Sequence, residues 1–286
     1  MTNKKSSLLL GAHMSIEGGM EKALERGESI GCTVIQLFTK SNRQWRSKSI
    51  SKDQAHLFKQ TQKKLGIKEV VAHASYLINL ASTNKEVVEK SRIALIDELE
   101  RCELLGIPTL VLHPGSAGIN SADAAIKQVA DHLNQAIKYA QSSTTIALEN
   151  MAGQGSALCS TFEQLAQIKG LATQKNRIGF CFDTCHAFVA GYNLADKKEY
   201  DNVWHEFEKH IPLSDLKVIH VNDSKKGLGS HVDRHEDIGK GTIGLTFFEL
   251  LMNDEQFVTI PKILETPKDS PEEDARNMAI LIGLIK

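Results

Sequence analysis

The sequence predicts an α/β fold, a (β/α)8 barrel formed as a single domain by residues 1–286. Eight short apolar runs recur along the chain, and each is typical of a strand buried on both faces of a parallel sheet. They are 7–13, 33–39, 69–75, 109–115, 145–150, 178–184, 217–223 and 262–266. Longer amphipathic segments separate these runs, and such alternation over 286 residues favours a closed barrel. A doubly wound open sheet is the alternative, but GAHMSIEGG after the first run is a poor match to the phosphate loop GxGxxG.

Four of the intervening segments carry explicit signals for helices. Segment 51–66 opens on a serine and closes on a glycine, and segment 83–106 has apolar residues at helical spacing before its closing glycine. Segments 121–140 and 270–285 each begin with serine and an acidic first turn, which suits the positive end of the helix dipole. We expect these helices to cover the outside of the barrel.

Composition limits the class of protein and its surroundings. The net charge of −1 gives no overall attraction to nucleic acid, so any basic surface must be local. The five cysteines lack disulfide-like spacing, and the chain opens without a long apolar segment. We therefore expect a reduced, cytoplasmic setting and no membrane partner.

Imidazoles and carboxylates end seven of the eight predicted strands. The carboxyl ends of the strands form the working face of a (β/α)8 barrel, so these groups should meet there. Buried carboxylates and imidazoles brought together in this way would be costly without a cation. The candidates at the strand ends and just beyond them are His13, His73, His113, Glu149, Asp183, His186, His220, Asp233, His235 and Glu265.

The types of ligand restrict the metal. Imidazole and carboxylate without thiolate suit Zn²⁺ or a similar first-row ion such as Mn²⁺. The candidates are too many for one tetrahedral ion, so we expect two or three ions with at least one bridging carboxylate; the spacing does not assign ligands to ions. Cys181 and Cys185 are four positions apart, which is not a CxxC redox pair. We interpret both as packing residues, with Cys181 on the same strand face as Asp183 and one layer deeper.

Eight motifs, in order over essentially the whole chain, make the sequence closely similar to endonuclease IV, the zinc-dependent apurinic/apyrimidinic endonuclease of base excision repair. The motifs are GAHMSIEGG (11–19), LFTKSNRQW (37–45), HASYLINL (73–80), LVLHPGS (110–116), ALENMAGQGS (147–156), CFDTCHAFVAGYNL (181–194), HVNDSKKGLGSHVDRHEDIGKGTIG (220–244) and PKILETP (261–267).

The resemblance implies a TIM barrel that carries three zinc ions, with Mn²⁺ as an alternative at one site. The implied ligands are His73, His113, Glu149, Asp183, His186, His220, Asp233, His235 and Glu265. In this assignment Glu149 bridges two ions, while His186, Asp233 and His235 hold the third. His13 is left outside the ligand set, as a residue that supports the ligands.

The implied reaction is hydrolysis of the phosphodiester 5′ to an abasic site, leaving a 3′-hydroxyl and a 5′-deoxyribose phosphate, with trimming of 3′ ends as a further activity. Activated water, neutralised phosphate charge and help for the leaving group are what zinc ions supply to such a reaction. Glu149 and Glu265 are the candidate catalytic residues that position or deprotonate the attacking water, and the choice between them stays open.

The implied partner is duplex DNA containing abasic sites, bound by a monomer. The candidate DNA-binding residues are Arg43, Gln44, Tyr76 and Leu77. By the resemblance, Arg43, Tyr76 and Leu77 wedge into the duplex. The alternative interpretation is that Tyr76, Leu77 and Trp45 only cap the barrel. We also expect Lys40 and Arg46 to contact phosphates.

Two alternatives and three departures qualify this hypothesis. A metal-dependent sugar isomerase or epimerase on a related barrel would have a mostly carboxylate site with fewer ions, whereas five of the nine proposed ligands are imidazoles. A barrel that only binds damaged DNA would lack ligands. Ala74 stands where the family often has Asp, Met151 where a small polar residue is common, and His231 where a basic residue is common. We expect Ala74 to remove a supporting hydrogen bond but no ligand.

Overall fold

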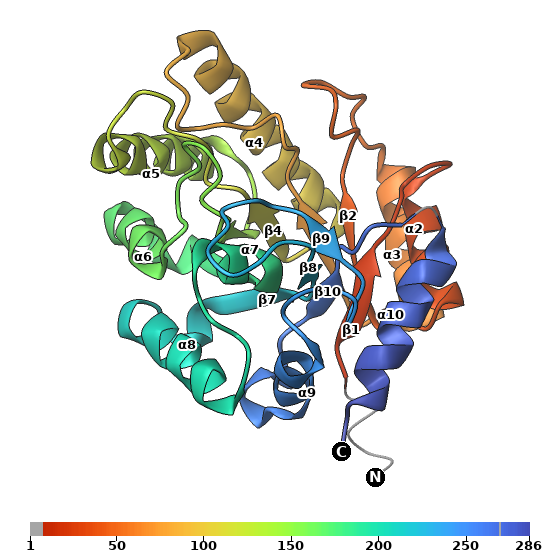
Figure 1. Cartoon of the computed structure of the whole chain (residues 1–286). Coiled ribbons are helices and arrows are strands. Elements are labelled where there is room, and N and C mark those ends of the chain that lie inside the picture. Colours follow the sequence, from red (N-terminus) through yellow and green to blue (C-terminus); the bar gives the residue numbers. More distant parts are fainter. Residues whose placement is uncertain (1–7, 269) are drawn as a thin grey trace.

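A computed structural model describes residues 8–268 and 270–286, and its strands form one closed barrel. All neighbouring barrel strands are parallel, and helices surround the barrel (Figure 1). The strands, in sequence order, are β1 (Leu10–His13), β2 (Val34–Phe38), β3 (Glu69–His73), β4 (Thr109–Leu112), β5 (Thr145–Glu149), β6 (Ile178–Asp183), β7 (Leu216–His220) and β10 (Lys262–Leu264). The predicted (β/α)8 architecture is confirmed.

Each of the eight predicted runs covers one barrel strand, although β7 begins one residue before its run, and several runs extend too far toward their carboxyl ends. The run 109–115, for example, is a strand only over Thr109–Leu112. Beyond it, Pro114 has no N–H to donate to a ladder, and Gly115 turns the chain with φ of 109°. Position 7, where the first run was predicted to begin, lies outside the described residues.

The four predicted helices are present as α3 (Lys52–Leu65), α4 (Lys85–Leu105), α5 (Ala122–Tyr139) and α10 (Pro271–Gly283). Ser51 begins α3 with a capping box, and Gly66 ends it in the left-handed conformation with φ of 70°. The remaining helices of the barrel wall are α2 (Met20–Ser29), α6 (Phe162–Leu171), α8 (Lys197–His210) and α9 (Leu245–Asn253), with short 3₁₀ turns η1 (Lys175–Arg177), η2 (Leu213–Asp215) and η3 (Glu255–Phe257). No helix formed by the described residues is long and apolar enough to cross a membrane.

Two elements near the centre of the barrel were not predicted. Helix α7 (Thr184–Ala190) follows β6 without a break. A short antiparallel pair, β8 (Asp223–Ser224) with β9 (His235–Glu236), lies within the loop that joins β7 to α9. This β7–α9 loop (221–244) contacts α7, because Gly229 and His231 donate backbone hydrogen bonds to Phe188 and Val189 (Figure 1).

An apolar layer fills the inside of the barrel. One residue from each of seven strands contributes to it, and all are essentially inaccessible to solvent: Val34, Val71, Val111, Ala147, Cys181, Val218 and Ile263. On β1 the corresponding residue is Gly11, where a Cβ would lie only 1.7 Å from the carbonyl oxygen of Val34. The larger apolar core lies between the strands and the helices, so the interior of the barrel is packed.

Candidate metal centre

The candidate centre is the layer of side chains directly above the apolar layer. Side chains alternate between the two faces of a strand, so the residue two positions after an inward-facing residue also faces inward. Val71 is followed in this way by His73, Ala147 by Glu149 and Cys181 by Asp183. The layer comprises His13, Gln36, His73, His113, Glu149, Asp183, His220 and Glu265. All except His13 and Gln36 are among the predicted ligands, and the structure brings them together.

Glu149 lies at the middle of this layer and is fully buried. Its Oε2 atom is 3.4 Å from His73 Nε2 and 3.1 Å from His113 Nε2. Its Oε1 atom is 3.1 Å from His220 Nδ1 and 3.3 Å from His186 Nδ1. One carboxylate therefore faces two separate pairs of imidazoles, which is the arrangement expected of a bridging ligand.

Electrostatics favour the ionised form of both glutamates. Burial alone would raise the pKa of Glu149, but His220 and His113 outweigh it and hold the pKa well below its ordinary value. Burial is likewise outweighed at Glu265, where His220 and His13 hold the pKa well below its ordinary value. The centre therefore presents negative charge that a cation can neutralise.

Helix α7 and the β7–α9 loop form the second half of the centre. Asp183 caps α7 by accepting a 2.7 Å hydrogen bond from the backbone N–H of His186, which turns both side chains toward the same space. Asp233 Oδ2 is 3.2 Å from His186 Nε2, and Asp233 Oδ1 is 3.4 Å from His235 Nε2. Burial would raise the pKa of Asp233, but the neighbouring imidazoles of His186 and His235 lower it to about 2.

The backbone contacts of three histidines show which ring nitrogen is available to a metal. Nδ1 lies 2.7 Å from the Ala74 carbonyl in His73, 3.0 Å from the Asn150 carbonyl in His186 and 2.9 Å from the Glu265 carbonyl in His235. A carbonyl only accepts, so each Nδ1 donates and each neutral ring keeps its lone pair on Nε2.

These Nε2 atoms face the carboxylates, and those of His186 and His235 are buried with no hydrogen-bond partner among the described residues. Lone pairs directed at carboxylates are unfavourable unless a cation lies between them, so these residues fit a metal centre. The bond from His73 to the backbone of Ala74 also means that residue 74 supports the ligand without a carboxylate.

The donor atoms form overlapping groups whose members lie within 4.8 Å of one another. Three of these groups consist of predicted ligands alone: His73, His113 and Glu149; Glu149, Asp183, His220 and Glu265; and Asp183, His186 and His235. Asp233 lies within the same limit of His235 and Cys185. Glu149 and Asp183 each belong to two of these three groups, so the geometry provides for more than one ion.

The two cysteines lie closer to the ligands than we expected. Cys181 belongs to a group with Glu149 and His220, and Cys185 to one with Asp233 and His235. Burial raises the pKa of each thiol to about 12. Cys181 also forms part of the apolar layer, so its environment favours the packing role predicted for it.

Asp223 holds the β7–α9 loop and was not recognised from the sequence. Its buried carboxylate accepts hydrogen bonds of 2.8 to 3.1 Å from four backbone N–H groups, those of Ser224, Gly239, Gly241 and Ile243. A Cβ on Gly241 would lie 2.3 Å from Asp223 Oδ1, so only glycine allows this approach. The motif HEDIGKGTIG therefore wraps around a fixed anion that places Asp233 and His235.

Two other supporting residues that were missed from the sequence lie one or two positions after a ligand. Asn150 accepts a 2.7 Å hydrogen bond from the backbone N–H of Asp183. Asn222 donates to Asp183 Oδ2 at 2.7 Å and accepts from the backbone N–H of Glu265 at 2.8 Å. Their positions, one after Glu149 and two after His220, are a signal in the sequence that could have identified them.

The four predicted DNA-binding residues lie in the loops after β2 and β3. Arg43 and Gln44 are exposed in the β2–α3 loop (39–51). Tyr76 is 55% exposed, and its ring lies 5.2 Å from the ring of His73 and 5.3 Å from that of His113. Leu77 is partly buried. These positions suit both capping and insertion into a duplex, so DNA binding by these residues stays a prediction.

The expectation that Lys40 contacts phosphate is wrong. Lys40 is buried, with its Nζ atom 2.6 Å from Asp97 and 3.6 Å from Glu98. Arg101 joins the same cluster through Asp97 and donates a 2.6 Å hydrogen bond to the carbonyl of Lys48. This buried ionic cluster attaches the β2–α3 loop to α4. The charge of Lys40 is therefore paired with α4 carboxylates and is not available to a phosphate.

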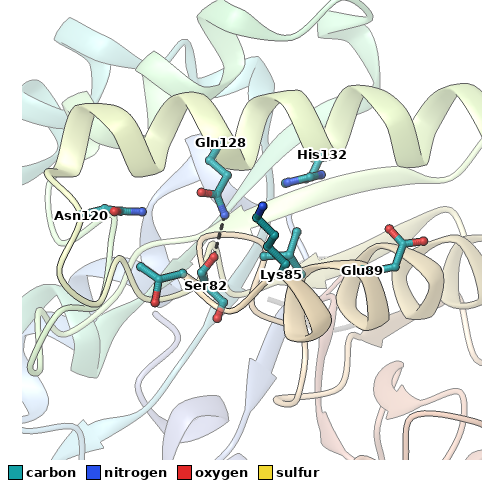
Figure 2. Close-up of a pocket in the computed structure, with 8 residues that line it drawn as sticks. Ser82, Lys85, Glu89, Asn120, Gln128 and His132 are labelled. Atoms are coloured by element: carbon teal, nitrogen blue, oxygen red, sulfur yellow. Dashed lines mark hydrogen bonds between the residues drawn. The ribbon is translucent and has the colours of Figure 1, made fainter.

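A hollow of about 460 Å³ lies away from the ligands, between α4 and α5 (Figure 2). Lys85, Glu89 and His132 are among the residues that line it. Gln128 donates 2.9 Å hydrogen bonds to the carbonyls of Leu80 and Ser82, which ties the loop after β3 to α5. None of the predicted ligands lines this hollow. The candidate metal centre is instead the place where the imidazole and carboxylate side chains from several strands meet.

Comparisons with known proteins agree with this geometry. The family model of the xylose isomerase-like TIM barrel matches residues 24–282. The chain is 47% identical over 279 residues to a curated protein named "Probable endonuclease 4" from Geobacter sulfurreducens, covering 97% of this chain and 94% of that protein.

Among solved structures, endonuclease IV from Thermus thermophilus matches with a TM-score of 0.86 and 34% identity, covering 96% of this chain and 98% of that one. A D-tagatose 3-epimerase-like protein matches with a TM-score of 0.72 but only 19% identity, which shows the shared fold alone. The chain therefore belongs to the endonuclease 4 family of nucleases, built on the xylose isomerase-like TIM barrel.

Proposed function

We propose that this nuclease cleaves duplex DNA at abasic sites, cutting the phosphodiester 5′ to the lesion and leaving a 3′-hydroxyl and a 5′-deoxyribose phosphate. It acts as a monomer in the cytoplasm, and trimming of 3′ ends is a further activity of the same site. The observation that supports it most is Glu149, which faces two pairs of imidazoles with its two oxygens.

Three zinc ions fit the donor groups better than one. His73, His113 and Glu149 would hold one, Glu149, Asp183, His220 and Glu265 a second, and His186, Asp233 and His235 a third. Mixed imidazole and carboxylate donors suit zinc, with Mn²⁺ as the alternative at one site. When bound, zinc supplies an acidified water and positive charge for the phosphate.

The two glutamates have different freedom to act on the attacking water. Glu149 is fully buried, and imidazoles occupy both of its oxygens. Glu265 is 12% exposed, and His220 Nδ1 lies 3.3 Å from its Oε2 atom. An ionised carboxylate that reaches the mouth can orient a water and accept its proton. We assign that role to Glu265 and the bridging role to Glu149.

Substrate recognition falls to the loops around the mouth. Arg43 and Gln44 extend from the β2–α3 loop, while Tyr76 and Leu77 follow β3 beside the ligand rings. An exposed aromatic ring beside an aliphatic side chain can enter the gap left by a missing base. Local cations on a protein with net charge −1 would confine DNA to this face.

The direct test uses the purified full-length protein and a duplex that contains one abasic site. We expect cleavage 5′ to that site, loss of cleavage after chelation, and recovery on adding zinc. Elemental analysis of protein purified without chelator should find close to three zinc ions per chain. An intact abasic duplex at full zinc loading, or turnover of a ketohexose in its place, would refute the proposed function.

The roles of the two glutamates can be tested by the isosteric changes Glu149→Gln and Glu265→Gln. Both should abolish cleavage with little change in DNA affinity, but Glu149→Gln should also lower the zinc content because it removes a shared ligand. Glu208→Gln, an exposed change on α8, is the matched control and should behave as the unmodified protein. Comparable cleavage by both variants would contradict the assignment.

A further inference from the structure

Gln36 is a fully buried amide in the layer that holds the candidate ligands. It lies on β2, two positions after Val34 of the apolar layer, just as His73 lies two positions after Val71. β2 is therefore the strand that contributes an uncharged residue where most of the other strands contribute imidazole or carboxylate. Because a buried amide without partners would be costly, its contacts indicate what it does.

The contacts of Gln36 fix the direction of its amide. Its Nε2 atom lies 2.5 Å from Glu265 Oε1 and 3.1 Å from His13 Nδ1, and its Oε1 atom lies 2.9 Å from His220 Nε2. An ionised carboxylate only accepts hydrogen bonds, so the group that faces Glu265 must be the NH₂. The amide oxygen is then left facing His220, and His220 Nε2 must donate to it.

The same logic assigns the other nitrogen of His220. With the proton on Nε2, a neutral His220 keeps its lone pair on Nδ1. Nδ1 is 3.1 Å from Glu149 and 3.3 Å from Glu265. Histidine ligands commonly donate their second N–H to a neighbouring acceptor, which orients the ring and fixes the tautomer. In His73, His186 and His235 that acceptor is a backbone carbonyl, whereas in His220 it is the side chain of Gln36.

We propose that Gln36 is a positioning residue of the metal centre. Its amide oxygen accepts a hydrogen bond from His220, so that Nδ1 of His220 faces the other ligands. Its NH₂ group donates one hydrogen bond to the Glu265 carboxylate and a second to Nδ1 of His13. No charged residue does both, because the position requires one acceptor and two donors within a single planar group. The effect on cleavage rests on the proposed function, but the effects on His220 and on zinc do not.

The first test is nitrogen-15 NMR of the zinc-loaded, unmodified protein, with His220 assigned by comparison with His220→Gln. We expect a protonated Nε2 and a zinc-bound Nδ1 in His220, the opposite of His73, His186 and His235. A zinc-bound Nε2 in His220 would overturn the proposal whether or not any Gln36 variant folds.

The second test separates the two functions of the amide. Gln36→Met keeps the length but loses every hydrogen bond, and we expect zinc affinity to fall roughly 10- to 100-fold with a loss of the His220 tautomer signature. Gln36→Glu can still accept from His220 but repels Glu265. Gln36→Glu should therefore keep the protonated Nε2 and zinc-bound Nδ1 of His220, while kcat falls roughly 10- to 100-fold.

Gln62→Met on α3 is the matched control, since it makes the same substitution and breaks one hydrogen bond, to the carbonyl of Ile67, far from the ligands. Thermal unfolding of all three variants would confirm that they are folded. Zinc affinity and His220 resonances unchanged in Gln36→Met would overturn the proposal. If the unmodified protein leaves abasic DNA intact but His220 responds as expected, the proposed function fails while the role of Gln36 stands.

Discussion

Two loops at the mouth of the barrel are held in place by different means. The β7–α9 loop closes on the buried carboxylate of Asp223 through four backbone hydrogen bonds, and its Gly241 allows the close approach. The β2–α3 loop is held near its ends by side chains, through Lys40 and through the bond from Arg101 to Lys48.

The way in which each loop is held matches the role proposed for the residues that it carries. Asp233 and His235 need fixed positions relative to α7, since a ligand displaced by even 1 Å fails to coordinate. Arg43 and Gln44 lie on an exposed tip, where the hydroxyl of Ser75 donates a 2.9 Å hydrogen bond to the Asn42 carbonyl. Backbone hydrogen bonds to Asp223 therefore hold the β7–α9 loop, which carries ligands. Side-chain contacts near its ends hold the β2–α3 loop and leave its tip exposed.

The largest effect should come from Asp223→Asn. Its new NH₂ group would face backbone donors, so about two charge-assisted hydrogen bonds would be lost. We expect a loss of about 3–5 kcal/mol in the free energy of unfolding, measured by denaturant titration. Zinc content should fall with it, because Asp233 and His235 would lose their placement. Asp131→Asn, an exposed change on α5, is the control, and unaltered zinc content in Asp223→Asn would remove the contrast between the loops.

Lys40→Met should produce the complementary result. It leaves Glu98 buried without its nearest lysine, which we expect to cost about 3 kcal/mol of stability. DNA affinity should weaken because the base of the β2–α3 loop loosens, whereas zinc content should stay unchanged. Lys40→Arg, which keeps the charge, should lie closer to the unmodified protein. A fall in zinc content in Lys40→Met would show that the β2–α3 loop and the β7–α9 loop do not act independently.

Arg43→Ala tests the exposed tip alone. We expect DNA affinity to fall roughly 10-fold, and the slope of log affinity against log salt to decrease by about 1 if the guanidinium contacts a phosphate. Stability and zinc content should not change, since Arg43 is exposed. Titrations of labelled duplex at several salt concentrations measure both quantities. Affinity equal to that of the unmodified protein would exclude Arg43 from the DNA interface.

The smallest effect is a difference in backbone opening. Amides of residues 41–47 should exchange with deuterium at least about 10-fold faster than those of Gly239, Gly241 and Ile243, because exposed loop backbone opens more readily than amides bonded to a buried anion. Mass spectrometry of timed exchange would show this. Equal protection of both segments would mean that the side-chain cluster fixes its loop as firmly as Asp223 does.

The architecture could be predicted from the sequence because a (β/α)8 barrel repeats one local unit, an apolar strand followed by an amphipathic helix. Each strand is an apolar run, and in seven of the eight an imidazole or carboxylate such as His73 or Glu149 lies at or just beyond its carboxyl end. The same pattern brought the proposed ligands together without a knowledge of distances. Cys181, placed one layer below Asp183 by alternation alone, does lie in the apolar layer.

The errors arose where function depends on partners distant in the chain. Lys40 was assigned to DNA because its charge lies in a basic segment, whereas Asp97 and Glu98 from α4 bury it. Asp223 was overlooked because the groups that bind it are backbone amides, which have no signature of their own. Gln36 could have been found, since the alternation that places His73 inward also places Gln36 inward, as one amide within the apolar run TVIQLFT.

The apolar layer beneath the ligands has a consequence for the strength of the site. Val71, Val111 and Ala147 form a floor of low polarisability, so water cannot screen the charges from below. Solvent reaches them only from the open side. The field of any bound cations is then directed outward, toward the one direction from which a phosphate can approach, and a polar replacement in this floor would weaken that field without touching a ligand.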